Sequence, residues 1–286
     1  MPAAESKGTL FLVATPIGNL EDMTYRGIRV LNEVDIIAAE DTRHAMKLLN
    51  HFEIKKPLVS YYEHNKRTRG DFLINKLLEG KNIALISDAG TPGISDPGED
   101  IVKLCIENEI KVTMVPGAVA AIVGLVLSGI SSKSFVYEGF LSMNKKERRE
   151  KISSLKEEVR TIVLYEAPHK LLKTLNDLYE ALGNRKIALA RELTKKYEEV
   201  LRLNLKDAIL KYENEAPKGE FVIVIEGADR DEILKEKINK WQELSLEEHY
   251  QMYISQGFEK KEAMKKVASD RGISKRDVYN KLIKGN

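Results

Sequence analysis

The sequence predicts an α/β protein with two tandem α/β domains and a small all-helical domain after them. Two observations carry this prediction. Short β-branched runs alternate with amphipathic stretches through most of the chain, and the alternation stops near Ala228. The length of 286 residues suits two domains and an appendage, and a hydrophobic share of 43% supplies material for their cores. We expect the domains to span residues 1–130, 131–228 and 229–286.

In the first domain the pattern predicts a mostly parallel sheet that is covered by helices. The predicted strands are residues 9–14, 34–39, 57–61, 82–87 and 111–115. The predicted helices are residues 24–32, 42–51, 68–79 and 99–109, and an apolar helix follows Gly117.

The second domain repeats the pattern after the small, polar stretch 128–133, where we place the boundary. The predicted strands are residues 135–139, 161–165, 187–191, 199–203 and 221–226. The predicted helices are residues 145–156 and 170–182.

The carboxyl-terminal part predicts four helices, at residues 231–242, 245–256, 260–270 and 274–283. Ser245 with Glu248, and Ser274 with Asp277, fit helix-capping patterns. Residues 259–284 hold nine Lys or Arg against four Asp or Glu, and the two helices broken at 271–273 resemble a helix-turn-helix. A solvated helical hairpin and a nucleic-acid contact both agree with this pattern.

Composition excludes several classes of protein. The net charge of +2 argues against a histone-like polycation, and the single Cys105 against a disulfide framework or a Cys-rich zinc site. The five histidines show no metal-ligand spacing, so we expect no metal. We see neither a signal peptide nor an apolar stretch of membrane-spanning length, and therefore expect a cytoplasmic protein.

Three turns that contain glycine or proline follow predicted strands of the first domain, at residues 14–19, 87–98 and 115–121. Carboxyl ends of parallel strands meet at one sheet edge, so the turns predict a shared small-molecule cleft. Neither a phosphate-binding loop nor a dinucleotide fingerprint is present. Each turn alone would also fit a tight turn or close helix–sheet packing.

Charged residues follow two of the predicted strands. Glu40, Asp41 and Arg43 come after one, and Arg191 and Glu192 after another. A carboxylate beside an arginine can orient a hydroxyl group or act as a base. A helix N-cap explains Asp41 equally well. No nucleophile motif is present.

Seven motifs occur in order along the chain, at residues 14–20, 39–43, 87–98, 137–141, 165–169, 190–195 and 218–220. The set resembles the ribosomal RNA small subunit methyltransferase I family of the tetrapyrrole methylase superfamily, over residues 8–228. The basic helical tail resembles that family's carboxyl-terminal domain. Tetrapyrrole methylases proper usually have a Gly-Gly-Asp-Pro loop, whereas this chain has Asp-Ala-Gly-Thr at 88–91. The departure argues against a porphyrin-type substrate.

The resemblance implies a homodimer with a cofactor cleft between the two α/β domains and S-adenosylmethionine as methyl donor. It implies 2′-O-methylation of cytidine 1402 in the decoding centre of 16S rRNA in the small ribosomal subunit. Methylation of a small tetrapyrrole is the alternative, and a non-catalytic RNA-binding module is a third possibility. The cofactor contacts that the resemblance implies are Thr15, Pro16, Asp88, Ala89, Gly90, Thr91, Gly93, Ala118, Ala120, Ala121, Glu166, Ala190, Gly219 and Glu220.

For such a reaction, Glu40, Asp41 and Glu192 are the candidate bases, and His64 is a weaker one because it also fits a surface loop. Arg43 and Arg191 would orient ribose or phosphate. We expect RNA to contact two basic elements, because lysine and arginine bind phosphates; a solvated helix face is the alternative for both. The residues are Lys145, Lys146, Arg148 and Arg149 in the first element, and Lys275 and Arg276 in the tail.

Overall fold

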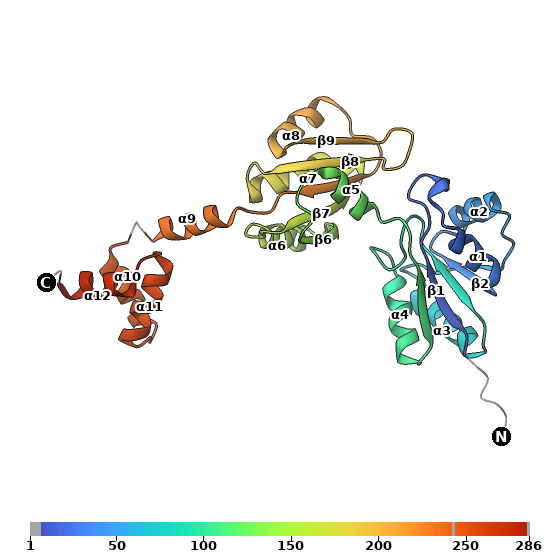
Figure 1. Ribbon diagram of the computed structural model, residues 1–286, viewed down its shortest axis with the longest axis horizontal. Helices are drawn as coiled ribbons and strands as arrows, with labels where there is room; N and C mark the ends of the chain where they lie inside the picture. Colours follow the sequence, from blue (N-terminus) through green and yellow to red (C-terminus); the bar gives the residue numbers. More distant parts are fainter. Residues whose placement is uncertain (1–6, 242–243, 285–286) are drawn as a thin grey trace, which may run out of the picture. The chain divides into compact units, whose positions relative to one another are not determined.

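The computed structural model describes residues 7–241 and 244–284 (Figure 1). The described residues up to 153, together with 161–226, form one compact unit, and residues 154–160 with those from 227 onward form a second. The first unit holds two five-stranded sheets, and the second is helical. The predicted fold class, two α/β parts followed by helices, is confirmed.

The first sheet is entirely parallel, in the order β3-β2-β4-β1-β5, as the alternating pattern predicted. Its strands are β1 (Thr9–Val13), β2 (Ile36–Ala39), β3 (Leu58–Ser60), β4 (Ile83–Ile86) and β5 (Lys111–Val115). The helices between them are a 3₁₀ turn (Leu20–Asp22), α1 (Tyr25–Glu33), α2 (Thr42–His51), α3 (Lys66–Leu78) and α4 (Gly98–Glu107). Every strand therefore ends at the same edge of the sheet.

Side-chain caps fix the starts of two of these helices. The Thr24 hydroxyl accepts a hydrogen bond from the Gly27 N–H at 3.0 Å, which begins α1. Asp41 caps α2 by accepting from the Arg43 N–H at 2.8 Å. Such caps satisfy amides that have no partner within the helix.

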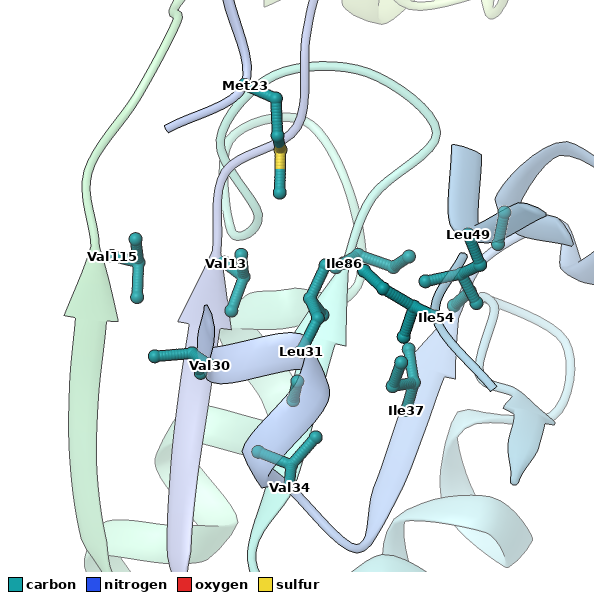
Figure 2. Close-up of a cluster of buried hydrophobic side chains, with 13 residues drawn as sticks. Val13, Met23, Val30, Leu31, Val34, Ile37, Leu49, Ile54, Ile86 and Val115 are labelled. Atoms are coloured by element: carbon teal, nitrogen blue, oxygen red, sulfur yellow. The ribbon is translucent and has the colours of Figure 1, made fainter. Parts of the chain in front are cut away.

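Both faces of the first sheet are covered. Helices α1 and α2 pack on one face, where Leu31 and Leu49 lie among Val13, Ile37 and Ile86 (Figure 2). Helices α3 and α4 cover the other face. Strand β4 is consequently buried along its whole length, which explains its uninterrupted apolar sequence.

The second sheet is mixed, in the order β6-β7-β10-β8-β9. Its strands are β6 (Phe135–Phe140), β7 (Thr161–Glu166), β8 (Lys186–Arg191), β9 (Glu199–Asn204) and β10 (Phe221–Ile225). Only the β6–β7 pair is parallel, and β10 runs antiparallel to both β7 and β8. The alternating pattern predicted these strands but not their directions, since it carries no information on which strands pair.

Four helices accompany the second sheet: α5 (Ala120–Ser128), α6 (Lys145–Ser154), α7 (Pro168–Leu182) and α8 (Leu205–Asn214). Helix α5 packs against the second sheet, with Ala121 and Leu125 in a buried cluster with Ala188 and Val222. The predicted boundary near residue 130 assigns α5 to the first domain, although the helix packs on the second sheet. The domain limits stay a prediction. Helix α8 was not predicted.

The second unit contains α9 (Arg230–Lys240), α10 (Leu246–Ser255), α11 (Lys260–Asp270) and α12 (Lys275–Lys284). The predicted capping box of Ser245 and Glu248 is confirmed, with both reciprocal hydrogen bonds present. Val267, Ala268 and Val278 form the buried centre of α10–α12. The end of the helix predicted over 231–242 lies outside the described residues. Within the described part of the chain, no helix has the length and apolar character needed to cross a membrane.

Candidate functional site

A cavity of about 280 Å³ lies within the first unit, where residues from both sheets meet. Ten of the predicted site residues line it: Glu40, Asp88, Ala89, Gly90, Thr91, Ala120, Glu166, Ala190, Glu192 and Glu220. Six further lining residues belong to the three turns that were predicted to form a cleft: Ile17, Ser87, Ile94, Ser95, Asp96 and Val119. The remaining lining residues come from the second sheet and its turns: Phe140, Tyr165, Ala167, Leu193, Lys195, Phe221 and Val222. The predicted residues Pro16, Gly93, Ala118, Ala121 and Gly219 are sequence neighbours of lining residues, and Thr15 lies two residues from Ile17.

The direction of β10 explains why the second sheet contributes so many of these residues. Phe221, at the start of β10, pairs with Glu166 at the end of β7 and with Arg191 at the end of β8. The turn that precedes β10 therefore reaches the same sheet edge as the turns that follow β7 and β8. This places Glu220 beside residues that are far away in sequence.

Two turns of the first sheet are joined at the cavity wall through Thr15 and Gly90. Their backbones exchange hydrogen bonds of 2.8 and 3.1 Å. Gly90 has a φ of +78°, and a Cβ there would lie 3.1 Å from Ile17 Cγ2 and 3.3 Å from the Ala118 carbonyl oxygen. Both the backbone angle and the crowding favour glycine at this position.

The cavity lining includes a group of interacting carboxylates. Burial, and then the charges of Asp88, Asp96 and Asp41, raise the pKa of Glu40. Burial also raises the pKa of Asp96, although the N–H groups of Gly93 and Gly98 donate to its carboxylate. Negative charge on Asp88 thus disfavours ionisation of both Glu40 and Asp96.

Other lining side chains form an apolar and aromatic set. It contains Ile17, Val119, Leu193 and Phe221, together with Tyr165. The Tyr165 hydroxyl accepts a hydrogen bond of 2.9 Å from the Ala121 N–H, and burial raises the pKa of Tyr165 to about 12. Such a surface suits a planar, largely apolar group of a ligand.

Lys195 connects two acidic residues of the second sheet. Its Nζ lies 2.9 Å from Glu192 Oε1 and 2.9 Å from Glu220 Oε2. Burial opposes ionisation of Glu192, but the hydrogen bonds from Lys195 and from the Glu220 N–H outweigh it and lower the pKa of Glu192. Among the described residues that line the cavity, Lys195 is the one lysine or arginine, and these two partners hold it.

Three non-glycine residues of the cavity region have left-handed backbone angles. Their φ values are +64° for Ser95, +49° for Glu192 and +64° for Thr194. Such conformations are uncommon for residues with a Cβ and gather at ligand sites.

The structure separates the candidate catalytic residues. Glu40 lines the cavity, whereas Asp41 caps α2 and binds the Arg43 guanidinium at 3.1 Å, which leaves the Arg43 side chain 90% exposed. Hydrogen bonds from Arg43 lower the pKa of Asp41. Arg191 pairs with Glu199 at 3.0 Å.

His64 is exposed, with its ring 6.3 Å from that of Tyr62, and it does not line the cavity. Of the three candidate carboxylates, Glu40 therefore combines a place in the cavity with a raised pKa.

One predicted RNA contact is wrong. Arg148 is 8% exposed, and its guanidinium donates to Asp177 at 2.7 Å and to the Thr174 hydroxyl at 2.8 Å. It shares the inner face of α6 with Ile152, one helical turn further on, so it cannot reach a phosphate. The other five predicted RNA-binding side chains are exposed: Lys145, Lys146, Arg149, Lys275 and Arg276.

No group of three or more His, Cys, Asp or Glu residues within 7–241 and 244–284 is arranged to hold a metal ion. The site is defined instead by its carboxylates and its apolar and aromatic side chains.

Comparison with known proteins places the chain in a family. The model for Tetrapyrrole (Corrin/Porphyrin) Methylases matches residues 9–209. Ribosomal RNA small subunit methyltransferase I of Halalkalibacterium halodurans is 51% identical over 276 residues, which cover 96% of this chain and 95% of that protein. The protein of the same name from Bacillus subtilis is 50% identical over 273 residues, or 96% of this chain and 93% of that protein.

Among solved structures, uroporphyrin-III C-methyl transferase from Thermus thermophilus, complexed with S-adenyl homocysteine, has a TM-score of 0.55. The match has 14% sequence identity and covers 76% of this chain and 97% of that one, so it shows the fold alone. The two close relatives align with nearly the whole chain. The fold with two sheets is also the fold of the solved structure. The chain therefore belongs to the ribosomal RNA small subunit methyltransferase I family of the tetrapyrrole methylases.

Proposed function

We propose that this chain transfers a methyl group from S-adenosylmethionine to the 2′-hydroxyl of cytidine 1402 in 16S rRNA of the small ribosomal subunit. The names of the close relatives support a ribosomal RNA substrate. The S-adenyl homocysteine in the fold relative supports the methyl donor, because that molecule remains after methyl transfer. The observation that carries the proposal is the cavity, which is lined by carboxylates together with apolar and aromatic side chains.

The residues present fit this methyl donor. When bound, S-adenosylmethionine supplies a methyl group activated by a positively charged sulfonium. Besides burial, the charge of Asp88 raises the pKa of both Glu40 and Asp96, and a positive charge beside these carboxylates would relieve that repulsion. The apolar lining around Val119 and Leu193 suits an adenine ring.

Glu40 is our proposed general base. A ribose hydroxyl is a weak nucleophile, and a carboxylate oxygen of Glu40 that accepts its proton would accelerate transfer by about 10²–10⁴-fold. The raised pKa of Glu40 suits this role, because a base works best when its pKa lies near the working pH. Asp41 and Glu192 have lowered pKa values and are held by other partners. Asp41 caps α2, and Glu192 binds Lys195.

The exposed cations of α6 and α12 would hold the RNA. Lys145, Lys146 and Arg149 lie on the outer face of α6, and Lys275 and Arg276 begin α12. Lysine and arginine contact phosphates without reading sequence, so these residues would supply affinity and the cavity would select the nucleotide. The proposal includes a homodimer, which sedimentation of the purified chain would test.

The decisive experiment supplies isotopically labelled S-adenosylmethionine with purified 30S subunits, with free 16S rRNA, or with a tetrapyrrole. We expect label in the 30S subunits, at one cytidine 2′-oxygen when the product is mapped. Label in the tetrapyrrole and none in either RNA sample would contradict the proposal. So would a labelled base instead of a labelled ribose.

A further inference from the structure

Glu166 has a buried hydrogen-bond system behind it. The residue ends β7, lines the cavity and is 3% exposed. Its Oε1 accepts from the N–H of Ala167 at 2.9 Å, and its Oε2 accepts from the Thr174 hydroxyl at 2.5 Å. Both carboxylate oxygens are therefore held by the protein.

The direction of the Thr174 hydroxyl is fixed by its other neighbour. Arg148 Nη2 donates to Thr174 Oγ1 at 2.8 Å. A guanidinium has donors only, so the single hydroxyl proton of Thr174 is left to point at Glu166. The donors thus run in one direction, from Arg148 through Thr174 to Glu166, and each hydrogen bond polarises the next.

Arg148 is held in turn by Asp177, whose Oδ2 lies 2.7 Å from its Nε. Arg148 and Thr174 are 8% and 1% exposed, so water does not compete for these groups. An arginine buried this far needs a carboxylate partner, and Asp177 supplies it from α7, the same helix that carries Thr174. The system joins α6, α7 and β7.

We propose that Thr174 and Arg148 are positioning residues, which hold the Glu166 carboxylate ready to accept a hydrogen bond from the methyl donor. The inference rests on the proposed function. A carboxylate only accepts, so its ligand partner is a donor group, a ribose hydroxyl or the ammonium of S-adenosylmethionine. Both groups are also present in S-adenosylhomocysteine, which lacks the sulfonium charge.

The test measures binding of S-adenosylmethionine and of S-adenosylhomocysteine by calorimetry, without turnover. Thr174→Val removes the hydroxyl at nearly constant shape, and we expect the Kd of both ligands to rise about tenfold, the effect of losing one hydrogen bond to a charged group. Thr174→Ser keeps the hydroxyl and should bind both ligands nearly as the wild type does. Arg148→Met should weaken both ligands in the same direction as Thr174→Val.

Thr161→Val is the matched control. Thr161 is 3% exposed, its hydroxyl donates to the Ser131 carbonyl oxygen at 2.6 Å, and it does not line the cavity. This variant loses a buried hydroxyl too, so its Tm should fall while ligand binding stays at the wild-type level.

Three results would overturn the inference. One is wild-type binding by Thr174→Val, and another is equal weakening by Thr161→Val and Thr174→Val. The third is failure of Thr174→Ser to restore binding. If the wild-type chain binds neither ligand, the proposed function fails first, and this inference fails with it.

Discussion

The backbone N–H of Asp41 donates a hydrogen bond to Oδ1 of Asp88 at 3.0 Å. The two residues follow β2 and β4, which are neighbours in the first sheet. Glu40 directly precedes Asp41, so this bond holds the Asp88 carboxylate beside Glu40. Together with burial, the charge of Asp88 raises the pKa of Glu40. A contact between two strand ends thus adds to the effect of burial on the ionisation of the proposed base.

We expect Glu40→Gln to lower kcat by about 10²–10⁴-fold, because glutamine cannot take up the ribose proton. The Kd of S-adenosylmethionine should change much less. Single-turnover assays on 30S subunits, together with calorimetry, would measure the two effects separately. Glu63→Gln, which changes a carboxylate that does not line the cavity, serves as the control. A near-normal rate for Glu40→Gln would refute the role of Glu40 as base.

The same variant should be more stable than the wild type at pH 7. A carboxyl group whose pKa is raised on folding stabilises the folded state at low pH, and this contribution is lost as the pH rises through the raised value. Glu40→Gln removes the charge, so its Tm should exceed that of the wild type at pH 7, and the difference should shrink toward about pH 4. Thermal melts across this pH range would show the trend, and a lower Tm at pH 7 would contradict it.

Gly90→Ala and Gly93→Ala form a matched pair. Both glycines have positive φ angles, +78° and +88°, so alanine at either position costs about 1–2 kcal/mol of backbone strain. Only Gly90 is crowded by Ile17 and Ala118, whereas a Cβ at Gly93 meets nothing within 4 Å. Urea unfolding should show the larger loss for Gly90→Ala, and equal losses would disprove the crowding argument.

Charge reversal should reveal the RNA-binding surfaces. Replacing Lys145, Lys146 and Arg149 by glutamate should weaken binding to 30S subunits and reduce its salt dependence, by about one unit of log–log slope per lost phosphate contact. Lys275→Glu with Arg276→Glu should act in the same direction. The doubly substituted control, Lys111→Glu with Lys173→Glu, changes exposed cations elsewhere. RNA affinity that falls equally in the control would contradict the assignment.

The helical unit should lose stability in mild acid because of His249. This side chain is fully buried, and Arg271 Nε donates to its Nδ1 at 3.1 Å, which requires a neutral ring. Burial and the charge of Arg271 lower its pKa, against the opposing effect of Asp270. The folded state therefore binds fewer protons than the unfolded state below about pH 6.5, and stability falls there. Hydrogen exchange in α10–α12 should accelerate as the pH drops from 8 to 5.5, once corrected for intrinsic exchange, and His249→Gln should reduce that acceleration.

Much of the fold could be predicted from the local pattern of apolar and polar residues in the sequence. The β-branched runs predicted every strand of both sheets. The signal was strongest for strands such as β4, which is buried along its length and therefore apolar throughout. Strand direction could not be predicted in the same way. The antiparallel course of β10 depends on pairing with β7 and β8, and no property of residues 221–225 alone encodes it.

The candidate site shows the same division. Glycine-bearing turns indicated Gly90 and its neighbours, whereas Phe221 and Val222 reach the cavity through strand pairing. In α6 a run of cations concealed the inward-facing Arg148, although its spacing of four from Ile152 was a usable signal. In α8 the buried residues Leu205, Ala208, Ile209 and Tyr212 follow a helical period that was equally visible.

The packing of α5 on the second sheet has a consequence for synthesis of the chain. Helix α5 leaves the ribosome long before β10, yet Leu125 shares a buried cluster with Val222 and Val224. The strand that completes the middle of the second sheet is also the last of its strands to be made. Strands β7 and β8 emerge earlier and can cover part of the apolar face of α5. The part that packs on β10 stays uncovered for about 100 residues of synthesis, roughly 5–20 s at ordinary elongation rates. During that interval, the part of α5 that β10 later covers is an apolar surface open to chaperones.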